Sequence, residues 1–244
     1  MKRILASLVC LGLLVVPASM AFAAEGLYVA PKFIYGYTQM NKTKMTMSGA
    51  ASESMNWNKN DSAFGGALAI GYDFNKQARI PVRAELEYAL FSEVSGKKTQ
   101  DFEGVLGGDV SMRGKQKIQA QTLFVNAYYD FRNETPFTPY LGAGIGLAFL
   151  RSKGSGNIEH TLPFEDSFSI GSKTTTNFAW NIGTGVAYDV TNNIALDLGY
   201  RFAGLGKANT KSLTDDFNGI ELSFQNKTKN VYMHQLALGV RFTF

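Results

Sequence analysis

Charged residues recur at every second position in several segments of the chain. The clearest case is Arg83, Glu85 and Glu87, which alternate with apolar side chains. Two carboxylates on one face of a strand could serve as general acid and base, or they could pair with arginines in a buried network. Arginines share the predicted interior and no substrate cleft can be inferred, so a salt-bridge network with a structural role is expected. Its predicted members are Lys32, Arg83, Glu85, Glu87, Asp197, Arg201 and Arg241.

Other reactive side chains are sparse. The chain has two histidines, His160 and His234, and one cysteine, Cys10. Neither histidine forms a recognisable triad, and too few ligands remain for a specific metal site. The alternating glycines of 142–146 lie inside one predicted strand, whereas a dinucleotide loop needs a turn and then a helix. We therefore expect no catalytic residues, no metal and no cofactor.

Eight segments with period-two alternation must position these side chains. One face of each is apolar, and the other carries glycine, polar or charged residues, as in strands that face lipid on one side and a polar interior on the other. No segment after the first 24 residues has helical periodicity. The eight predicted strands are about 26–40, 62–74, 81–91, 117–131, 139–150, 174–190, 194–203 and the segment that ends at Phe244.

The connections between these segments alternate strictly in length. Those at about 75–80, 132–138 and 191–193 are short, and the other four, at about 41–61, 92–116, 151–173 and 204–229, are long and polar. Outer-membrane barrels have short periplasmic turns and long extracellular loops. The pattern predicts an all-β fold, an eight-stranded antiparallel up-and-down barrel with four long extracellular loops. A soluble β-sandwich of similar composition is the alternative.

The predicted long loops carry both signs of charge, so a solvated surface is expected there rather than a steering patch. The charged residues considered are Lys42, Lys44, Lys97, Lys98, Asp101, Arg113, Asp166, Lys173, Lys211, Asp215 and Asp216.

Residues 1–23 resemble a cleaved secretory signal. Lys2 and Arg3 precede an apolar run, and Ala21 and Ala23 form a small-x-small cleavage site. The run is shorter than the roughly 20 residues that a membrane-spanning helix needs. We expect cleavage to leave residues 24–244 as one barrel domain.

Aspartates and aromatic residues are expected at the barrel ends. Asp73, Asp130 and Asp189 each follow a tyrosine near the end of an even-numbered predicted strand, and are expected to ring the periplasmic mouth and bind turn amides. Aromatic residues near strand ends are expected to form interfacial girdles. The chain itself ends on two alternating aromatics, Phe242 and Phe244.

Five stretches carry a family resemblance: NAYYDF at 126–131, PYLGAGIG at 139–146, GTGVAYD at 183–189, LDLGYRF at 196–202 and GVRFTF at 239–244. They resemble the small outer-membrane β-barrel families, which include opacity-type proteins, the rickettsial surface antigens and the barrel of outer-membrane protein A. The resemblance implies surface-exposed loops that are often antigenic or host-binding. It also implies that the barrel-assembly machinery reads the C-terminal strand through Phe242 and Phe244.

The expected function is that of a non-enzymatic surface protein in the bacterial outer membrane, with loops that act in adhesion or as antigens. A narrow porin is the alternative. A lipid A-modifying enzyme is less favoured. Resemblance to the lipid A deacylases would require a histidine and a serine near the outer rim, and Leu236 rather than serine follows His234 two positions on. The expected partners are outer-membrane lipid, lipopolysaccharide, the assembly machinery and a host receptor or matrix. Nucleic acid is not expected, because the formal charge of +4 includes the two cations of the signal.

Overall fold

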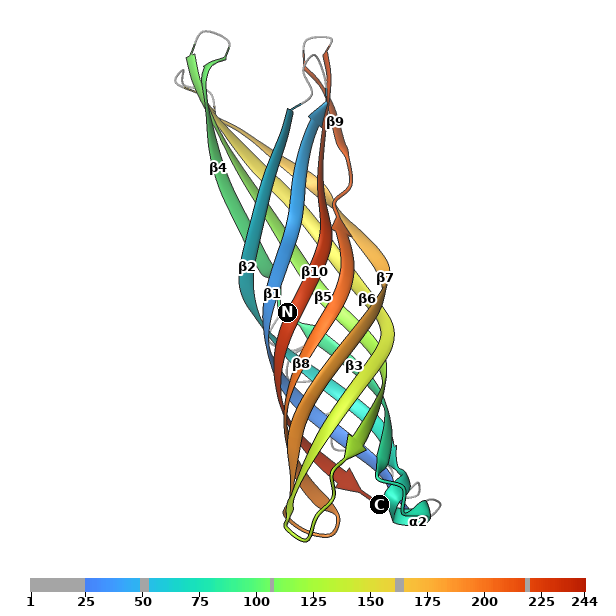
Figure 1. Cartoon of the computed structure of the whole chain (residues 1–244). Coiled ribbons are helices and arrows are strands. Elements are labelled where there is room, and N and C mark those ends of the chain that lie inside the picture. Colours follow the sequence, from blue (N-terminus) through green and yellow to red (C-terminus); the bar gives the residue numbers. More distant parts are fainter. Residues whose placement is uncertain (1–24, 49–52, 106–107, 161–164, 218–219) are drawn as a thin grey trace, which may run out of the picture.

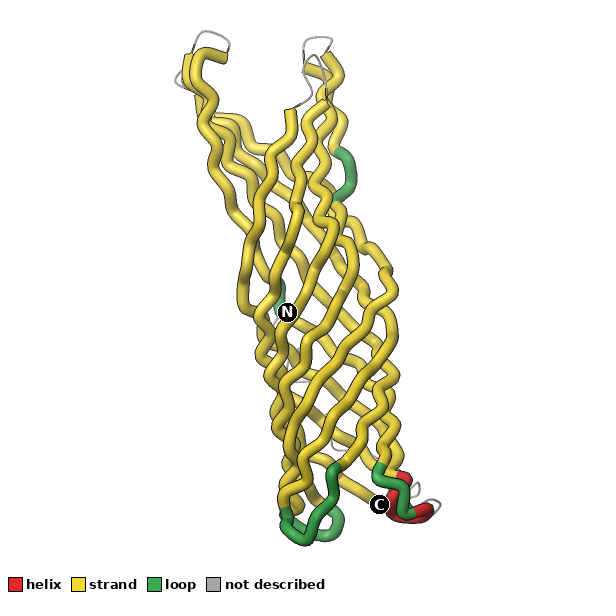
Figure 2. The backbone as a smooth tube through the Cα atoms, in the orientation of Figure 1, coloured by secondary structure: helices red, strands yellow, loops and turns green. Residues whose placement is uncertain are grey.

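The computed structural model describes residues 25–48, 53–105, 108–160, 165–217 and 220–244, and nearly all of this backbone is strand (Figure 2). The elements are β1 (Leu27–Ser48), β2 (Glu53–Asp73), α2 (Phe74–Ala78), β3 (Val82–Phe91), β4 (Val94–Val105), β5 (Gly108–Asp130), β6 (Phe137–His160), β7 (Glu165–Asp189), β8 (Ile194–Asn209), β9 (Leu213–Phe217) and β10 (Ile220–Thr243).

Eight of the strands form a closed antiparallel ring, which confirms the predicted barrel. The order is β1-β2-β3-β5-β6-β7-β8-β10, and β10 pairs back onto β1. The last residue completes the seam, because the Phe244 amide donates to the Leu27 carbonyl at 2.9 Å. Strands β4 and β9 lie outside the ring, paired with β5 and β10 respectively. Closure pairs the strand edges that lipid could not satisfy.

Period-two alternation separates the two faces of the wall. Along β3 the even-numbered side chains from Leu86 to Leu90 are exposed, whereas the odd-numbered ones from Arg83 to Phe91 are buried. Large apolar side chains cover the outside, with Ile145 61% and Phe178 66% exposed. Such a surface is stable only against acyl chains, so the outer wall is the lipid-facing one.

The strands are longer than the sequence pattern predicted. Strands β6 and β7 have 24 and 25 residues, about twice the 9–11 residues with which a strand crosses a bilayer. Much of the four segments expected as loops is therefore strand, paired in hairpins as in Ser155 opposite Ser169. The polar residues of these segments indicate contact with water and for that reason predict loops, but the backbone groups of the segments pair with each other as strands.

Above the apolar belt the wall opens into two groups of strands. Pairing of β2 with β3 ends at Gly65 and Phe91, and pairing of β7 with β8 ends at Trp180 and Gly204. Beyond these points β4 to β7 diverge from β1, β2, β9 and β10 (Figure 1). The hairpins thus extend beyond the barrel as two separate groups of paired strands.

The opposite end is compact. Three short turns lie there, one of which contains the five-residue helix α2, which the sequence did not predict. Its N-cap is Asp73, whose side chain accepts from the Asn75 amide at 2.9 Å. None of the described helices is long and apolar enough to cross a membrane.

Candidate functional site

A lower ionic zone fills the barrel interior toward the short-turn end. At its centre, the Lys32 ammonium from β1 lies 2.5 Å from Glu85 and 2.7 Å from Glu87, both on β3. The other Glu87 oxygen accepts from Arg201 of β8 at 2.7 Å. Each glutamate is at most 4% exposed. The two carboxylates are thus held by cations, an arrangement typical of a buried network rather than of an acid–base pair.

Two further arginine–aspartate pairs complete this zone. The Arg83 guanidinium donates to the Asp130 carboxylate through Nε and Nη2 at 2.9–3.0 Å. The Cζ atom of Arg83 lies 4.9 Å from the centre of the Tyr128 ring. The second pair is wider, with Arg241 Nε 3.7 Å from Asp197. The zone therefore brings together all seven residues expected in the interior network, and recruits Asp130 from the set expected at the mouth.

The charges of the lower ionic zone balance. Four cations, Lys32, Arg83, Arg201 and Arg241, face four carboxylates, Glu85, Glu87, Asp130 and Asp197. A cavity of about 50 Å³ lies among them, which is room for water but not for a solute such as a sugar. An eight-stranded barrel is just wide enough for its own side chains to fill it. The arrangement can therefore neutralise and close the interior.

Glycines make this filling possible. The ring of Tyr128 lies where a side chain on Gly142 would stand, and the ring of Tyr140 lies over Gly185 and Gly199. Tyr128 in turn donates to Glu85 at 3.2 Å. Gly142 of β6, Gly185 of β7 and Gly199 of β8 thus provide space for two tyrosine rings, whereas Gly144 faces the Asn126 side chain and Gly146 faces the β5 backbone.

An upper apolar zone closes the interior toward the hairpins. Most of the larger inward side chains above the ionic zone are aliphatic, aromatic or thioether groups, each at most 5% exposed. A few buried hydroxyl and amide side chains lie on the same stretches of strand, and Gln116 donates to Ser152 at 2.9 Å. The larger members of the apolar cluster are Ile34, Met40, Phe91, Val94, Ile118, Phe124, Leu150, Leu205, Val231 and Met233. The sequence pattern predicted mainly small, polar or charged side chains on the inward face. The signal for this zone was present in the inward register, where Lys32 is followed by Ile34 and Glu87 by Ala89 and Phe91.

The three carboxylates expected at the periplasmic mouth behave differently. Asp73 caps α2 and also accepts from Arg132 at 2.6 Å. Asp130 binds Arg83 instead of a turn amide. Asp189 is exposed on the turn side of β7. The common spacing after tyrosine therefore placed all three near one end but did not give them a common role.

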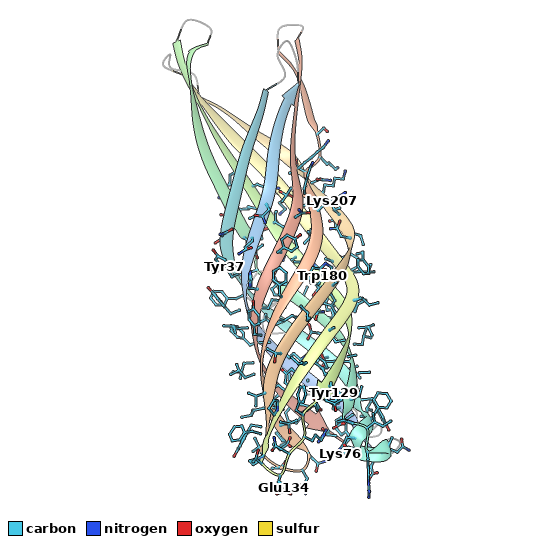
Figure 3. All side chains as sticks on the ribbon, in the orientation of Figure 1. Tyr37, Lys76, Tyr129, Glu134, Trp180 and Lys207 are labelled. Atoms are coloured by element: carbon cyan, nitrogen blue, oxygen red, sulfur yellow. The ribbon has the colours of Figure 1, made fainter. Side chains whose placement is uncertain are left out.

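Aromatic side chains lie at two levels on the outer wall (Figure 3). Tyr129 marks the lower level, whereas Tyr37 and Trp180 mark the upper level. On β7 the outward positions from Tyr188 to Phe178 span eleven residues, and the ten steps between them rise about 25 Å along a tilted strand, the height of a bilayer's apolar band. These two levels are the expected girdles.

His234 belongs to the upper girdle. Its Nδ1 lies 2.7 Å from the Tyr200 hydroxyl, and its ring packs 4.9 Å from that of Phe202. The side chain is therefore on the outer wall, as its register predicted, and no serine or carboxylate contacts it within the described part of the chain. His160 lies at the end of β6, where side chains are outside the described set. Within the described residues no group of metal-ligating side chains is found.

The aromatic side chains at the end of the chain face outward. Phe242 and Phe244 lie on the outer wall, 41% and 36% exposed. Their backbone register with β1 closes the barrel. The predicted cleavage residues Ala21 and Ala23 lie outside the described residues.

A closed barrel with an apolar outer belt, two aromatic girdles and a filled interior defines a transmembrane β-barrel of the outer-membrane class. Residues 6–244 match the family model of the outer membrane protein beta-barrel domain. The chain belongs to this family, and is a surface protein of the bacterial outer membrane.

Individual relatives agree with this assignment. The outer membrane protein PagN of Salmonella typhimurium is 32% identical over 246 residues, which cover 97% of this chain and 98% of PagN. A candidate adhesin of Rickettsia conorii is 28% identical over 185 residues, with 75% and 69% coverage. The crystal structure of OprG from Pseudomonas aeruginosa is similar in fold, with a TM-score of 0.50, 14% identity and coverage of 89% and 96%.

Proposed function

We propose that the protein is a non-enzymatic adhesin, whose hairpins bind a host receptor or matrix beyond the outer membrane. The observation that carries this proposal is the length of the strands. Strand β7 has 25 residues, but its apolar outward positions end at Phe178, so about half of it lies beyond the lipid. A barrel that served only to span the membrane would not need these extensions.

Two findings support a binding role over transport or catalysis. Side chains fill the lumen at two levels, in the ionic zone and in the apolar zone. The relatives include a candidate adhesin. Adhesion is a function that a sealed barrel can perform, because it uses only the extracellular surface. The same surface would make the protein accessible as an antigen.

Attachment of cells that carry shortened hairpins tests this proposal. Residues 156–168 can be replaced by an Asn-Gly turn between Ser155 and Ser169, which are paired in register. The equivalent change in the β1–β2 hairpin joins Met45 to Met55. We expect the doubly shortened barrel to fold, as shown by heat-modifiable gel mobility, and attachment to fall to the level of cells that lack the protein.

Glu134→Gln is the matched control, because Glu134 is at the opposite end (Figure 3). This variant should attach normally. Undiminished attachment by the shortened barrel would refute the adhesion proposal.

Export and assembly belong to the same proposal. Residues 1–23 would be cleaved after Ala23 to leave the barrel, and the assembly machinery would bind the strand that ends in Phe242 and Phe244. The exposure of both rings on the outer wall supports this role, because a partner can reach them before the seam closes. The mature N-terminus, read by mass spectrometry, tests the first step. Accumulation of unfolded Phe244→Ala in the periplasm tests the second.

A further inference from the structure

The outer wall is not uniform in charge just above the upper girdle. On β5 and β6 the outward positions there carry Lys115, Lys117, Arg151 and Lys153, which we call the outer basic patch. On β1 and β2 the corresponding outward positions carry amides and hydroxyls. Asn60 donates to the Tyr37 hydroxyl at 2.8 Å, and Ser62 lies 2.8 Å from that of Tyr35. The outer face of β5 and β6 is therefore basic at this level, whereas the described outer face of β1 and β2 is neutral.

The cations of the outer basic patch are close together. Lys117 and Lys153 are direct cross-strand partners, and Arg151 is opposite Gln119 on the same face. Facing side chains of an antiparallel pair stand about 5 Å apart, where like charges destabilise the sheet. Such repulsion is characteristic of a surface that is completed by an anion.

The protein itself neutralises only part of the positive charge of the patch. Glu93 lies 3.1 Å from Lys117 and 3.8 Å from Lys153. Within the described part of the chain, Lys115 and Arg151 have no ion-pair partner. Lys117 and Lys153 also remain 43% and 45% exposed. The patch thus has a net charge of +3 and free donors that point away from the barrel.

The height of the outer basic patch identifies its partner. Arg151 is two residues beyond the outward Phe149, and Lys153 is four beyond it, or about 5 and 10 Å along the membrane normal for a tilted strand. Aromatic girdles lie at headgroup level. The cations therefore lie where the phosphates of an outer-leaflet lipid begin, and they lie on the wall that faces lipid rather than at the hairpin tips.

We propose that the outer basic patch is a binding site for the phosphate groups of one lipopolysaccharide molecule, held against the outer faces of β5 and β6. Arginine and lysine donate charge-assisted hydrogen bonds to phosphate, and the acyl chains would lie along the apolar wall below. This inference depends on the outer-membrane location, but not on adhesion.

Lipid retention in native mass spectrometry tests the site. The full barrel, refolded in detergent, is titrated with lipid A that carries two phosphates, one or none. We expect the doubly phosphorylated form to bind best, and Arg151→Gln/Lys153→Gln to weaken its binding about 10- to 30-fold, since each cation near an anionic surface contributes a few-fold. Lys227→Gln/Lys229→Gln is the matched control. It removes the same charge from the outward face of β10, where Lys227 is paired with Lys44 of β1 on one side and with the uncharged Asn209 of β8 on the other.

Three results would overturn the proposal. The first is equal losses in the two double variants, which would indicate general charge attraction. The second is retention that does not depend on the number of phosphates. The third is a patch-dependent preference for a soluble sulfated polysaccharide over lipid A, which would make the patch an extracellular binding surface. Heat-modifiable mobility verifies that each variant is folded, and none of these results involves host attachment.

Discussion

The lower ionic zone and the upper apolar zone fill the same lumen, from the same strands, in opposite ways. On β8 the inward sequence changes from Asp197 and Arg201 to Ala203 and Leu205 within a few residues. Charges in the lower zone need specific partners, because an unpaired buried charge is costly. Apolar groups in the upper zone need only close packing. The comparison shows that a narrow barrel can be closed by complementary charge and by volume together.

Gln235 joins the two zones. Its Oε1 accepts from Arg201 at 2.7 Å, and its Nε2 lies 3.2 Å from the Met233 sulfur. Arg201 also lies over the Phe124 ring, 5.5 Å from its centre. The boundary therefore consists of side chains that can contact a charge on one side and an apolar group on the other.

The largest effect is expected from Glu87→Ala in the ionic zone. This change leaves Lys32 and Arg201 without their shared carboxylate, and loss of one partner from a buried pair costs about 3–5 kcal/mol. Urea unfolding in lipid vesicles, followed by tryptophan fluorescence, measures the loss. Glu134→Gln at the exposed turn is the control and should not change the free energy of unfolding. A cost below about 1 kcal/mol would mean that the two cations find other partners.

In the apolar zone, Leu205→Ala should cost somewhat less. Leu205 is fully buried, and truncation of such a residue costs about 2–5 kcal/mol, depending on how far the cavity collapses. The same urea titration measures it, and Leu205→Met, which keeps the volume, should stay within about 1.5 kcal/mol of wild type. Equal costs for the two variants would show that volume does not determine the stability of this zone.

Single-channel conductance in planar bilayers tests whether the two zones close the lumen. We expect no stable conductance steps from the wild type, because both zones close the lumen, and none from Leu205→Ala, because the ionic zone remains. Large stable steps from the wild type would instead favour the narrow porin.

A smaller effect is expected when a whole ion pair is replaced. Arg83→Met/Asp130→Leu removes both partners of the bidentate pair. Well-packed apolar replacements of a buried pair are often neutral or stabilising, so the double variant should lie within about 1 kcal/mol of wild type, while Asp130→Leu alone should cost about 3–5 kcal/mol. A double-mutant cycle gives the coupling. If the double variant is as unstable as the single one, the ionic zone depends on this particular pair.

The smallest effect is expected outside the lumen. Glu93→Gln removes the partner of Lys117 and Lys153, which are exposed, and such surface pairs contribute about 0–1 kcal/mol. Unfolding in high and low salt measures it. A cost comparable to that of Glu87→Ala would mean that burial does not distinguish the two networks.

Period-two alternation, the loop-length pattern and the terminal aromatics determined the barrel, the number of strands in the ring and the face on which each residue lies. Side-chain period along a strand is fixed by covalent geometry, so register can be derived from the sequence. For the same reason the sequence predicts the inward face for the seven charged residues of the ionic zone. The hairpin extensions were not, since polar segments form strand or loop according to pairing with a distant partner, which the local sequence does not encode.

Only the tertiary structure decided which charges pair, and that Asp130 joins Arg83. Each of these depends on the stagger between strands that are far apart in sequence, such as β3 and β8. The stagger sets the height at which Glu87 and Arg201 meet, and it is fixed only when β10 closes onto β1.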